Sequence, residues 1–115
     1  MDRLFVPLST DPFNWFVLGK KKWELRRRGR QYTRHHVRVG RSVEFRRGYR
    51  GRDALWGEIV AVIEADSIEE FFRKVPFREV IPTATSVEEA IAISTGILRV
   101  EANTPILGFE IGNLR

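Results

Sequence analysis

Residues 19–26 read Gly-Lys-Lys-Lys-Trp-Glu-Leu-Arg, and they constrain the fold most because they join a helix to a strand. The glycine ends the preceding helix, since it adopts a positive φ at low steric cost. Beyond it, the side chains of an extended chain alternate between two faces. Trp23 and Leu25 are therefore predicted to enter a core. Glu24 and Arg26 are predicted to pair on the opposite face, with lysines beside them to meet an anion or a base edge.

Short apolar segments predict the other strands, at residues 4–8, 42–46, 55–63 and 106–111. Pro7 limits the first of these to a sheet edge or a strand end, because proline cannot donate a backbone hydrogen bond. The third is apolar except for Glu58 and is expected to be buried on much of both faces, with Gly57 marking a bulge or a close backbone approach. A carboxylate in such a strand needs a partner, and Arg26 is the candidate.

Capping signals predict three short helices. Asp11 is the expected N-cap of the first, with a proline at the first helical position. The apolar side of this helix is formed by Phe13, Phe16 and Val17. Ser67 and Ser86 each begin a capping box, in which a glutamate follows three residues later. The third helix is predicted to end near Thr95, because Gly96 acts as its C-terminal breaker.

Together these elements predict an α+β fold, a small mixed β-barrel of about five strands with about three short helices packed outside it. The chain of 115 residues, 43% of them apolar, suits a single domain over residues 1–115. It has no cysteine, which excludes disulfides, a thiolate nucleophile and cysteine zinc sites. No apolar run is long enough for a membrane span and no signal peptide is evident, so a cytoplasmic location without membrane contact is expected.

The net charge of +5 conceals a strongly basic segment. Residues 20–52 hold 14 Lys and Arg against two glutamates, a net charge of +12, whereas residues 53–115 carry −6. Such an asymmetry is typical of a polyanion-binding surface, although charge runs also serve as solvated faces. RNA or another single-stranded nucleic acid is the expected partner. The residues predicted to contact it are Lys20, Lys21, Lys22, Arg26, Arg27, Arg28, Arg30, Tyr32, Arg46, Arg47, Arg50 and Arg52.

Some ring side chains in or near this segment leave two interpretations open. Trp15 lies off the apolar side of its helix and suits either a core contact or stacking on a base. Tyr32 lies among arginines and suits either stacking on an exposed base or anchoring its loop to the barrel. His35 and His36 are adjacent, so in an extended chain they would face opposite ways and could not grip a metal together. No metal and no cofactor are predicted.

The order of these elements resembles the ASCH domain, a family of the PUA-like superfamily of β-barrels. The likeness covers nearly the whole chain and rests first on a G-x-K-x-x-E-x-R motif that follows a helix. The motif is formed by Gly19, Lys21, Glu24 and Arg26. A Val-Gly turn at residues 39–40 also matches, except that Arg41 stands where aspartate is common. Residues 77–82 and 86–90 are similar to a region of small prokaryotic members.

The resemblance implies a cleft at the barrel mouth, lined by the motif, that takes RNA or a nucleotide. Relatives are linked to RNA binding in coactivator contexts, to ribonuclease activity and to removal of the acetyl group from acetylcytidine. RNA binding is the first expectation for this chain. A ribonuclease in the same cleft is the alternative, with Lys21 stabilising the phosphate charge and Glu24 acting as general base. Arg26 beside Glu24 would favour the charged carboxylate and weaken that base.

An amidohydrolase acting on an acetylated cytidine nucleoside is the second alternative. The related enzymes resemble this chain at Lys21, but they have a threonine where Glu24 stands, and a glutamate between the last two helices. Glu79 is the only carboxylate in that interval here, and is therefore the third catalytic candidate. The loss of the threonine hydroxyl removes the nucleophile of that chemistry, so this alternative ranks last.

Overall fold

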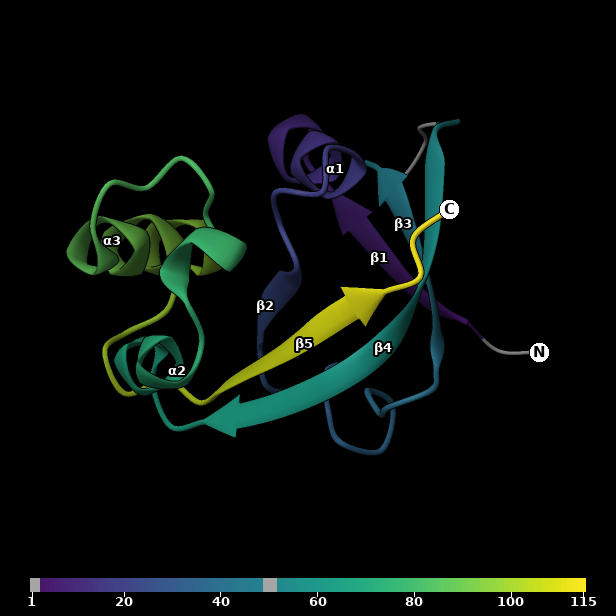
Figure 1. Ribbon diagram of the computed structural model, residues 1–115. Coiled ribbons are helices and arrows are strands. Elements are labelled where there is room, and N and C mark those ends of the chain that lie inside the picture. The colour runs from purple at the N-terminus through teal and green to yellow at the C-terminus, as the bar shows by residue number, and fades with distance from the viewer. Residues whose placement is uncertain (1–2, 49–51) are drawn as a thin grey trace.

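The computed structural model describes residues 3–48 and 52–115, which form one five-stranded mixed sheet with helices packed outside it (Figure 1). The strands are β1 (Leu4–Leu8), β2 (Trp23–Arg27), β3 (Ser42–Arg47), β4 (Ala54–Ala65) and β5 (Ile106–Gly112). Their order is β1-β3-β4-β5-β2, with β1 and β3 parallel and the other neighbours antiparallel. The sheet curves into a half-barrel, which confirms the predicted α+β barrel-like fold.

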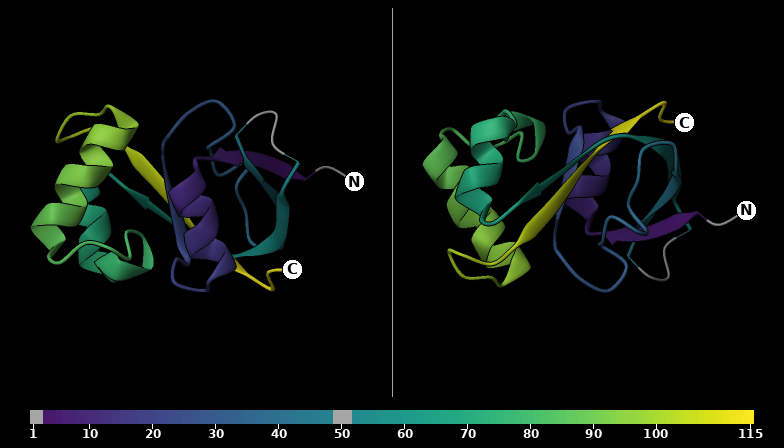
Figure 2. Two further views of the ribbon diagram at one scale, coloured as in Figure 1. Left: turned by 90° about the horizontal axis from the view of Figure 1, so that it is seen from above. Right: turned by 90° about the horizontal axis from the view of Figure 1, so that it is seen from below.

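Three α-helices cover the sheet: α1 (Thr10–Val17), α2 (Ile68–Lys74) and α3 (Val87–Leu98). α1 lies against β1 and β3, whereas α2 and α3 pair at the end of β4 that leads into α2 (Figures 1 and 2). Both capping boxes are confirmed, because the amides of Glu70 and Glu89 donate to Ser67 Oγ and Ser86 Oγ at 3.0 and 3.1 Å. None of the helices in the described residues is long and apolar enough to cross a membrane.

The buried apolar side chains form two clusters, one at each end of the molecule. The first fills the half-barrel beneath α1, where the rings of Phe16 and Phe45 stack at 4.5 Å. The second joins α2 and α3 to β2, β4 and β5, with Phe71 edge-on to Trp23 at 5.9 Å. Trp23 and Leu25 are both buried in this second cluster, as the alternation along the strand predicts. The junction between helix and strand therefore connects the two cores.

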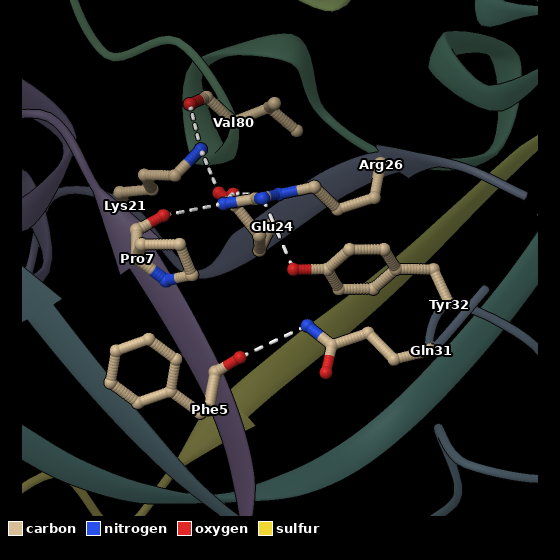
Figure 3. Close-up of polar contacts among 8 residues, drawn as sticks. All are labelled: Phe5, Pro7, Lys21, Glu24, Arg26, Gln31, Tyr32 and Val80. Atoms are coloured by element: carbon tan, nitrogen blue, oxygen red, sulfur yellow. Dashed lines mark hydrogen bonds and ion pairs between the residues drawn. The ribbon is translucent and has the colours of Figure 1, made fainter. Parts of the chain in front are cut away.

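β1 and β2 form the two edges of the sheet, and side chains bridge the space between them. Pro7 in β1 has no N–H to donate to a further strand, in keeping with its predicted edge position. Arg26 Nη2 instead donates to the Pro7 carbonyl at 2.9 Å, and Gln31 Nε2 donates to the Phe5 carbonyl at 3.0 Å (Figure 3). These hydrogen bonds hold the mouth of the half-barrel at the place where the motif lies.

Two predicted helix ends are wrong. α1 has Ser9 as its N-cap in place of Asp11, because a proline in the first turn needs no N–H partner and the helix can begin earlier. Val17, predicted to be buried, is 56% exposed at the end of that helix. α3 continues through Gly96 to Leu98, since a helical glycine costs only about 1 kcal/mol. Leu98 offsets that cost by packing on the second cluster.

The long strand β4 also differs from its prediction. It is less buried than its apolar sequence indicates, with Val60 41% exposed, and the irregularity in its pairing lies at that residue instead of at Gly57. The close approach at Gly57 is confirmed, because a Cβ there would lie 2.5 Å from Ile111 Cγ2. Glu58 contacts Asn113 at 3.4 Å and does not pair with Arg26. The reason is topological, since β5 separates β4 from β2.

The two adjacent histidines do not face opposite ways. Residues 33–37 form a tight turn, in which the amides of His36 and Val37 donate to the Thr33 carbonyl at 3.0 and 2.7 Å. The turn brings the rings of His35 and His36 to 4.8 Å, edge to face. Over residues 3–48 and 52–115, no group of three or more His, Cys, Asp or Glu side chains could hold a metal ion.

Candidate functional site

The motif residues lie where α1 turns into β2. Gly19 has a φ of +73°, the left-handed conformation predicted for it, and the chain becomes extended at Trp23. Trp23 and Leu25 point into the second cluster, so Glu24 and Arg26 face the other way, toward β1. Local alternation along one strand therefore places the carboxylate and the guanidinium together.

Lys21, Glu24 and Arg26 form one ion-paired network (Figure 3). Glu24 Oε2 accepts from Arg26 Nε at 2.7 Å and lies 2.6 Å from Nη2, which confirms the predicted pair. Glu24 Oε1 lies 3.5 Å from Lys21 Nζ, which also donates to the Val80 carbonyl at 2.7 Å. The sequence predicted that the lysines beside this pair would meet an anion. Lys21 is instead a buried part of the network, with only 4% of its surface exposed.

Burial changes the acid–base chemistry of Lys21. Loss of solvation lowers the pKa of its ammonium group below the ordinary 10.5, and the nearby charge of Arg26 lowers it further. The charge and hydrogen bond of Glu24 oppose this shift without cancelling it. Since a buried amine with a lowered pKa releases its proton more readily than a surface lysine, Lys21 suits proton transfer as well as binding.

The guanidinium group of Arg26 donates hydrogen bonds to several groups of the protein. Besides Glu24, its Nη1 donates to the Tyr32 hydroxyl at 3.1 Å and its Nη2 to the Pro7 carbonyl. The guanidinium lies 5.1 Å from the centre of the Tyr32 ring, which stacks on Phe109 at 6.3 Å. Of the two interpretations of Tyr32, these contacts favour the anchor that ties the basic loop to the barrel. Arg26 therefore links Glu24, Tyr32 and Pro7 at the centre of the site.

Two adjoining hollows open at this network. The first has a volume of about 270 Å³ and is walled by β1 and α1, by the motif side chains, by Val80 and Ile81, and by α3. The second, of about 910 Å³, follows the chain from Arg26 to Tyr32. Both are lined by Pro7, Arg26, Ile97 and Leu98, so they form one continuous cleft. We call them the motif pocket and the arginine hollow.

The arginine hollow carries uncompensated positive charge. Arg27, Arg28 and Arg30 line it, and all three are exposed. Arg28 pairs with Glu64 at 3.1 Å, whereas no acid in the part of the chain that the structure describes pairs with Arg27 or Arg30. These two side chains are therefore available to an anion from solution. Lys20 and Lys22 are also exposed, near the junction, outside both hollows.

The other predicted arginines lie elsewhere. Arg46 pairs with Glu44, and Arg47 lies 5.0 Å over the Phe13 ring and donates to Asn14 at 3.1 Å. Arg52 is exposed, and neither hollow is lined by any of these three. Arg50, also predicted to bind nucleic acid, lies outside the described residues. Among the described residues, the structure thus places Arg27, Arg28 and Arg30 beside the motif, and Arg46, Arg47 and Arg52 away from both hollows.

Two features of the site were missed by the sequence analysis. Ser94 of α3 lines the motif pocket and is 4% exposed, but a single serine in an apolar helix belongs to no recognisable motif. The carbonyl that holds Lys21 belongs to Val80, next to the candidate Glu79. Glu79 itself lines neither hollow, and its own carbonyl accepts from the Lys22 amide at 2.8 Å.

A buried carboxylate, that of Glu44, lies away from the cleft. Glu44 is 1% exposed and accepts from both Arg3 and Arg46. Burial alone would raise the pKa of Glu44, but the hydrogen bonds and charges of the two arginines outweigh it and hold the pKa below the ordinary 4.5. Arg46 is therefore engaged within the fold by a buried partner.

Solved structures share this fold at low sequence identity. The hypothetical protein PH0355 matches over 96% of this chain and 97% of its own, with a TM-score of 0.77 and 20% identity. Protein PF0455 from Pyrococcus furiosus matches over 96% of each chain, with a TM-score of 0.68 and 22% identity. ASCH from Zymomonas mobilis matches over 95% of this chain and 66% of its own, with a TM-score of 0.66 and 12% identity.

No protein-family model and no curated protein sequence matches the chain. The chain nevertheless has the fold of ASCH from Zymomonas mobilis, a small half-barrel with helices outside it, as the G-x-K-x-x-E-x-R motif and the order of elements predicted. The similarity extends over nearly the whole chain.

Proposed function

We propose that this chain binds single-stranded RNA along the continuous cleft formed by the motif pocket and the arginine hollow. The observation that carries the proposal is the position of Arg27 and Arg30, which are exposed in the hollow beside the motif. Arginine side chains bind the phosphate groups of nucleic acids, and each such contact is favoured by the release of condensed counterions.

The shape of the cleft favours a single strand over a duplex. The motif pocket is small and mostly apolar, with a few polar groups in its lining, as in sites that bind small molecules. The arginine hollow beside it is open and basic. Single strands are usually recognised by cations that follow the backbone and by pockets that accept the bases, which a paired duplex keeps stacked. An ASCH-type fold is in keeping with this proposal.

The test is a fluorescence-anisotropy titration of labelled single-stranded RNA, duplex RNA and single-stranded DNA at several salt concentrations. The double variant Arg27→Gln/Arg30→Gln should flatten the slope of log K against log salt by about 1.4, since each single-strand phosphate contact contributes about 0.7. Arg73→Gln/Lys74→Gln is the matched control, because it removes two positive charges from α2, where both residues pair with helix acids. Equal slopes in the two variants would refute the proposed surface.

A ribonuclease in the same cleft is the second candidate, and the buried Lys21 favours it. A lysine with a lowered pKa beside a carboxylate is the kind of pair found at sites of acid–base catalysis. The RNA recovered from the titrations should be run on a gel. Fragments that vanish with Lys21→Met would establish cleavage by this site. Intact RNA would show that the protein binds RNA without cleaving it. No observation on the described residues favours the acetylcytidine alternative.

A further inference from the structure

The connection from β2 to β3 carries a second group of cations, at residues 33–41 (Figure 1). We call these residues the basic turn. It contains Arg34, Arg38 and Arg41 and no acidic residue, and it lines neither the motif pocket nor the arginine hollow. Arg34 lies 3.7 Å from Glu64, whereas no acid in the described part of the chain pairs with Arg38 or Arg41. The basic turn therefore has a net positive charge of its own.

The backbone of the basic turn is anchored to the barrel. Val37 is fully buried in the first cluster. The Gly40 amide donates to the Ile59 carbonyl at 2.8 Å, and the Ile59 amide donates to the Arg41 carbonyl at 2.9 Å. These contacts order the turn before any ligand binds, which lowers the entropic cost of binding.

Two arginines of the turn keep hydrogen-bond donors for a ligand. Arg38 Nη1 donates to the His35 carbonyl at 2.5 Å, and Arg41 Nη1 donates to the His36 carbonyl at 2.6 Å. Arg38 is exposed and Arg41 is half-buried. Because a guanidinium group has five N–H groups, each side chain retains donors after its contact with the turn. Each thus holds a positive charge in a defined position, which suits the binding of an anion.

The basic turn adjoins the arginine hollow at Glu64, on β4. Glu64 Oε2 lies 3.1 Å from Arg28 Nε, and Glu64 Oε1 lies 3.7 Å from Arg34 Nη1. Arg28 lines the hollow and Arg34 belongs to the turn, so one carboxylate contacts cations of both surfaces. A single negative charge cannot neutralise both arginines. A strand that leaves the hollow beside Arg28 would therefore meet further cations.

We propose that the basic turn binds the phosphate backbone of the RNA strand beyond the part that the arginine hollow holds. Cations that follow one another along a surface bind successive phosphates of a single strand. The inference rests on the proposed RNA binding and lengthens the bound strand past Glu64, outside the cleft. It adds Arg38 and Arg41 to the residues that contact RNA.

The test is a titration of labelled single-stranded RNA oligomers of about four and about 16 nucleotides, the range of site sizes for small single-strand-binding domains. In Arg38→Gln/Arg41→Gln, the slope of log K against log salt should flatten by about 1.4 for the longer oligomer. The slope for the shorter oligomer should not change, because that strand occupies the hollow alone. Neither arginine contacts Glu64, so this variant leaves the border of the hollow intact.

Two control variants separate charge from structure. Arg38→Lys/Arg41→Lys keeps both charges and should retain the wild-type slope, since the release of counterions depends on charge. Arg73→Gln/Lys74→Gln removes two positive charges from α2 and should leave the slopes for both oligomers unchanged. An equal loss of slope in the lysine variant would assign the effect to the shape of the turn and overturn the inference.

The outcomes also distinguish this inference from the proposed function. If Arg27→Gln/Arg30→Gln flattens the slope for the longer oligomer and Arg38→Gln/Arg41→Gln does not, RNA binding stands and the basic turn takes no part in it. Equal flattening for both lengths by the second variant would refute a single path from the hollow to the turn. If wild-type protein binds neither oligomer at low salt, both proposals fail.

Discussion

Replacing Glu24 by glutamine should destabilise the protein strongly, because it removes the carboxylate that is ion-paired with both the buried Lys21 and the partly buried Arg26. Glu24 is 7% exposed, Lys21 is 4% exposed, and the carboxylate binds both Lys21 and Arg26. Removing one partner of a buried ion pair typically costs 3–5 kcal/mol, and glutamine keeps one acceptor oxygen, so we expect about 3 kcal/mol.

That free energy converts into a large change in melting temperature. The entropy of unfolding is about 2.1 cal/mol/K per residue near the melting point, or roughly 0.24 kcal/mol/K for a chain of 115 residues. A loss of about 3 kcal/mol should therefore lower the melting temperature by about 12 °C. Thermal unfolding followed by circular dichroism at neutral pH measures this shift directly.

Glu58→Gln is the control, because it makes the same chemical change on β4. Glu58 is half-buried, and the one hydrogen bond of its carboxylate among the described residues is the 3.4 Å contact with the Asn113 amide, so its variant should melt within about 2 °C of wild type. Equal melting temperatures for Glu24→Gln and wild type would show that the network contributes no stability and would refute the reasoning. A large fall for both variants would show that the effect is not specific to the buried site.

Three further changes test other parts of the structure. The native pKa of Glu44 is lowered, so the stability that its carboxylate contributes is present above about pH 4.5 and is lost as the pH falls through the native pKa. The free energy of unfolding of Glu44→Gln, measured in urea, should therefore approach that of wild type in acid. The native pKa of Lys21 is also lowered, so between that pKa and about pH 10.5 the unfolded chain binds more protons than the native protein. In this pH range, the stability of wild type should therefore rise relative to that of Lys21→Met, as measured by urea unfolding. Gly57→Ala should lower stability by about 1–3 kcal/mol in the same assay, because its Cβ would lie 2.5 Å from Ile111. A parallel pH dependence in either charge variant, or an unchanged midpoint for Gly57→Ala, would contradict these expectations.

Interactions within a few residues were predictable from the sequence. The left-handed Gly19 just beyond α1, the buried positions of Trp23 and Leu25, and the pairing of Glu24 with Arg26 all follow from backbone sterics and alternation along one extended segment. Both capping boxes depend on a serine and on the amide three residues beyond it. Because such rules act locally, they also located the motif and the basic segment around it.

What surrounds the motif was decided by tertiary structure. Lys21 donates to Val80, 59 residues away in the sequence, and α3 brings Ser94 to the pocket without any local signal. Burial of Glu44 by two arginines, and the contact of Glu58 with Asn113, depend likewise on which strands are neighbours. A sequence pattern specifies which side of an element is apolar, but the partner of a polar group is set by the packing of distant segments, which alone brings the walls of the cleft together.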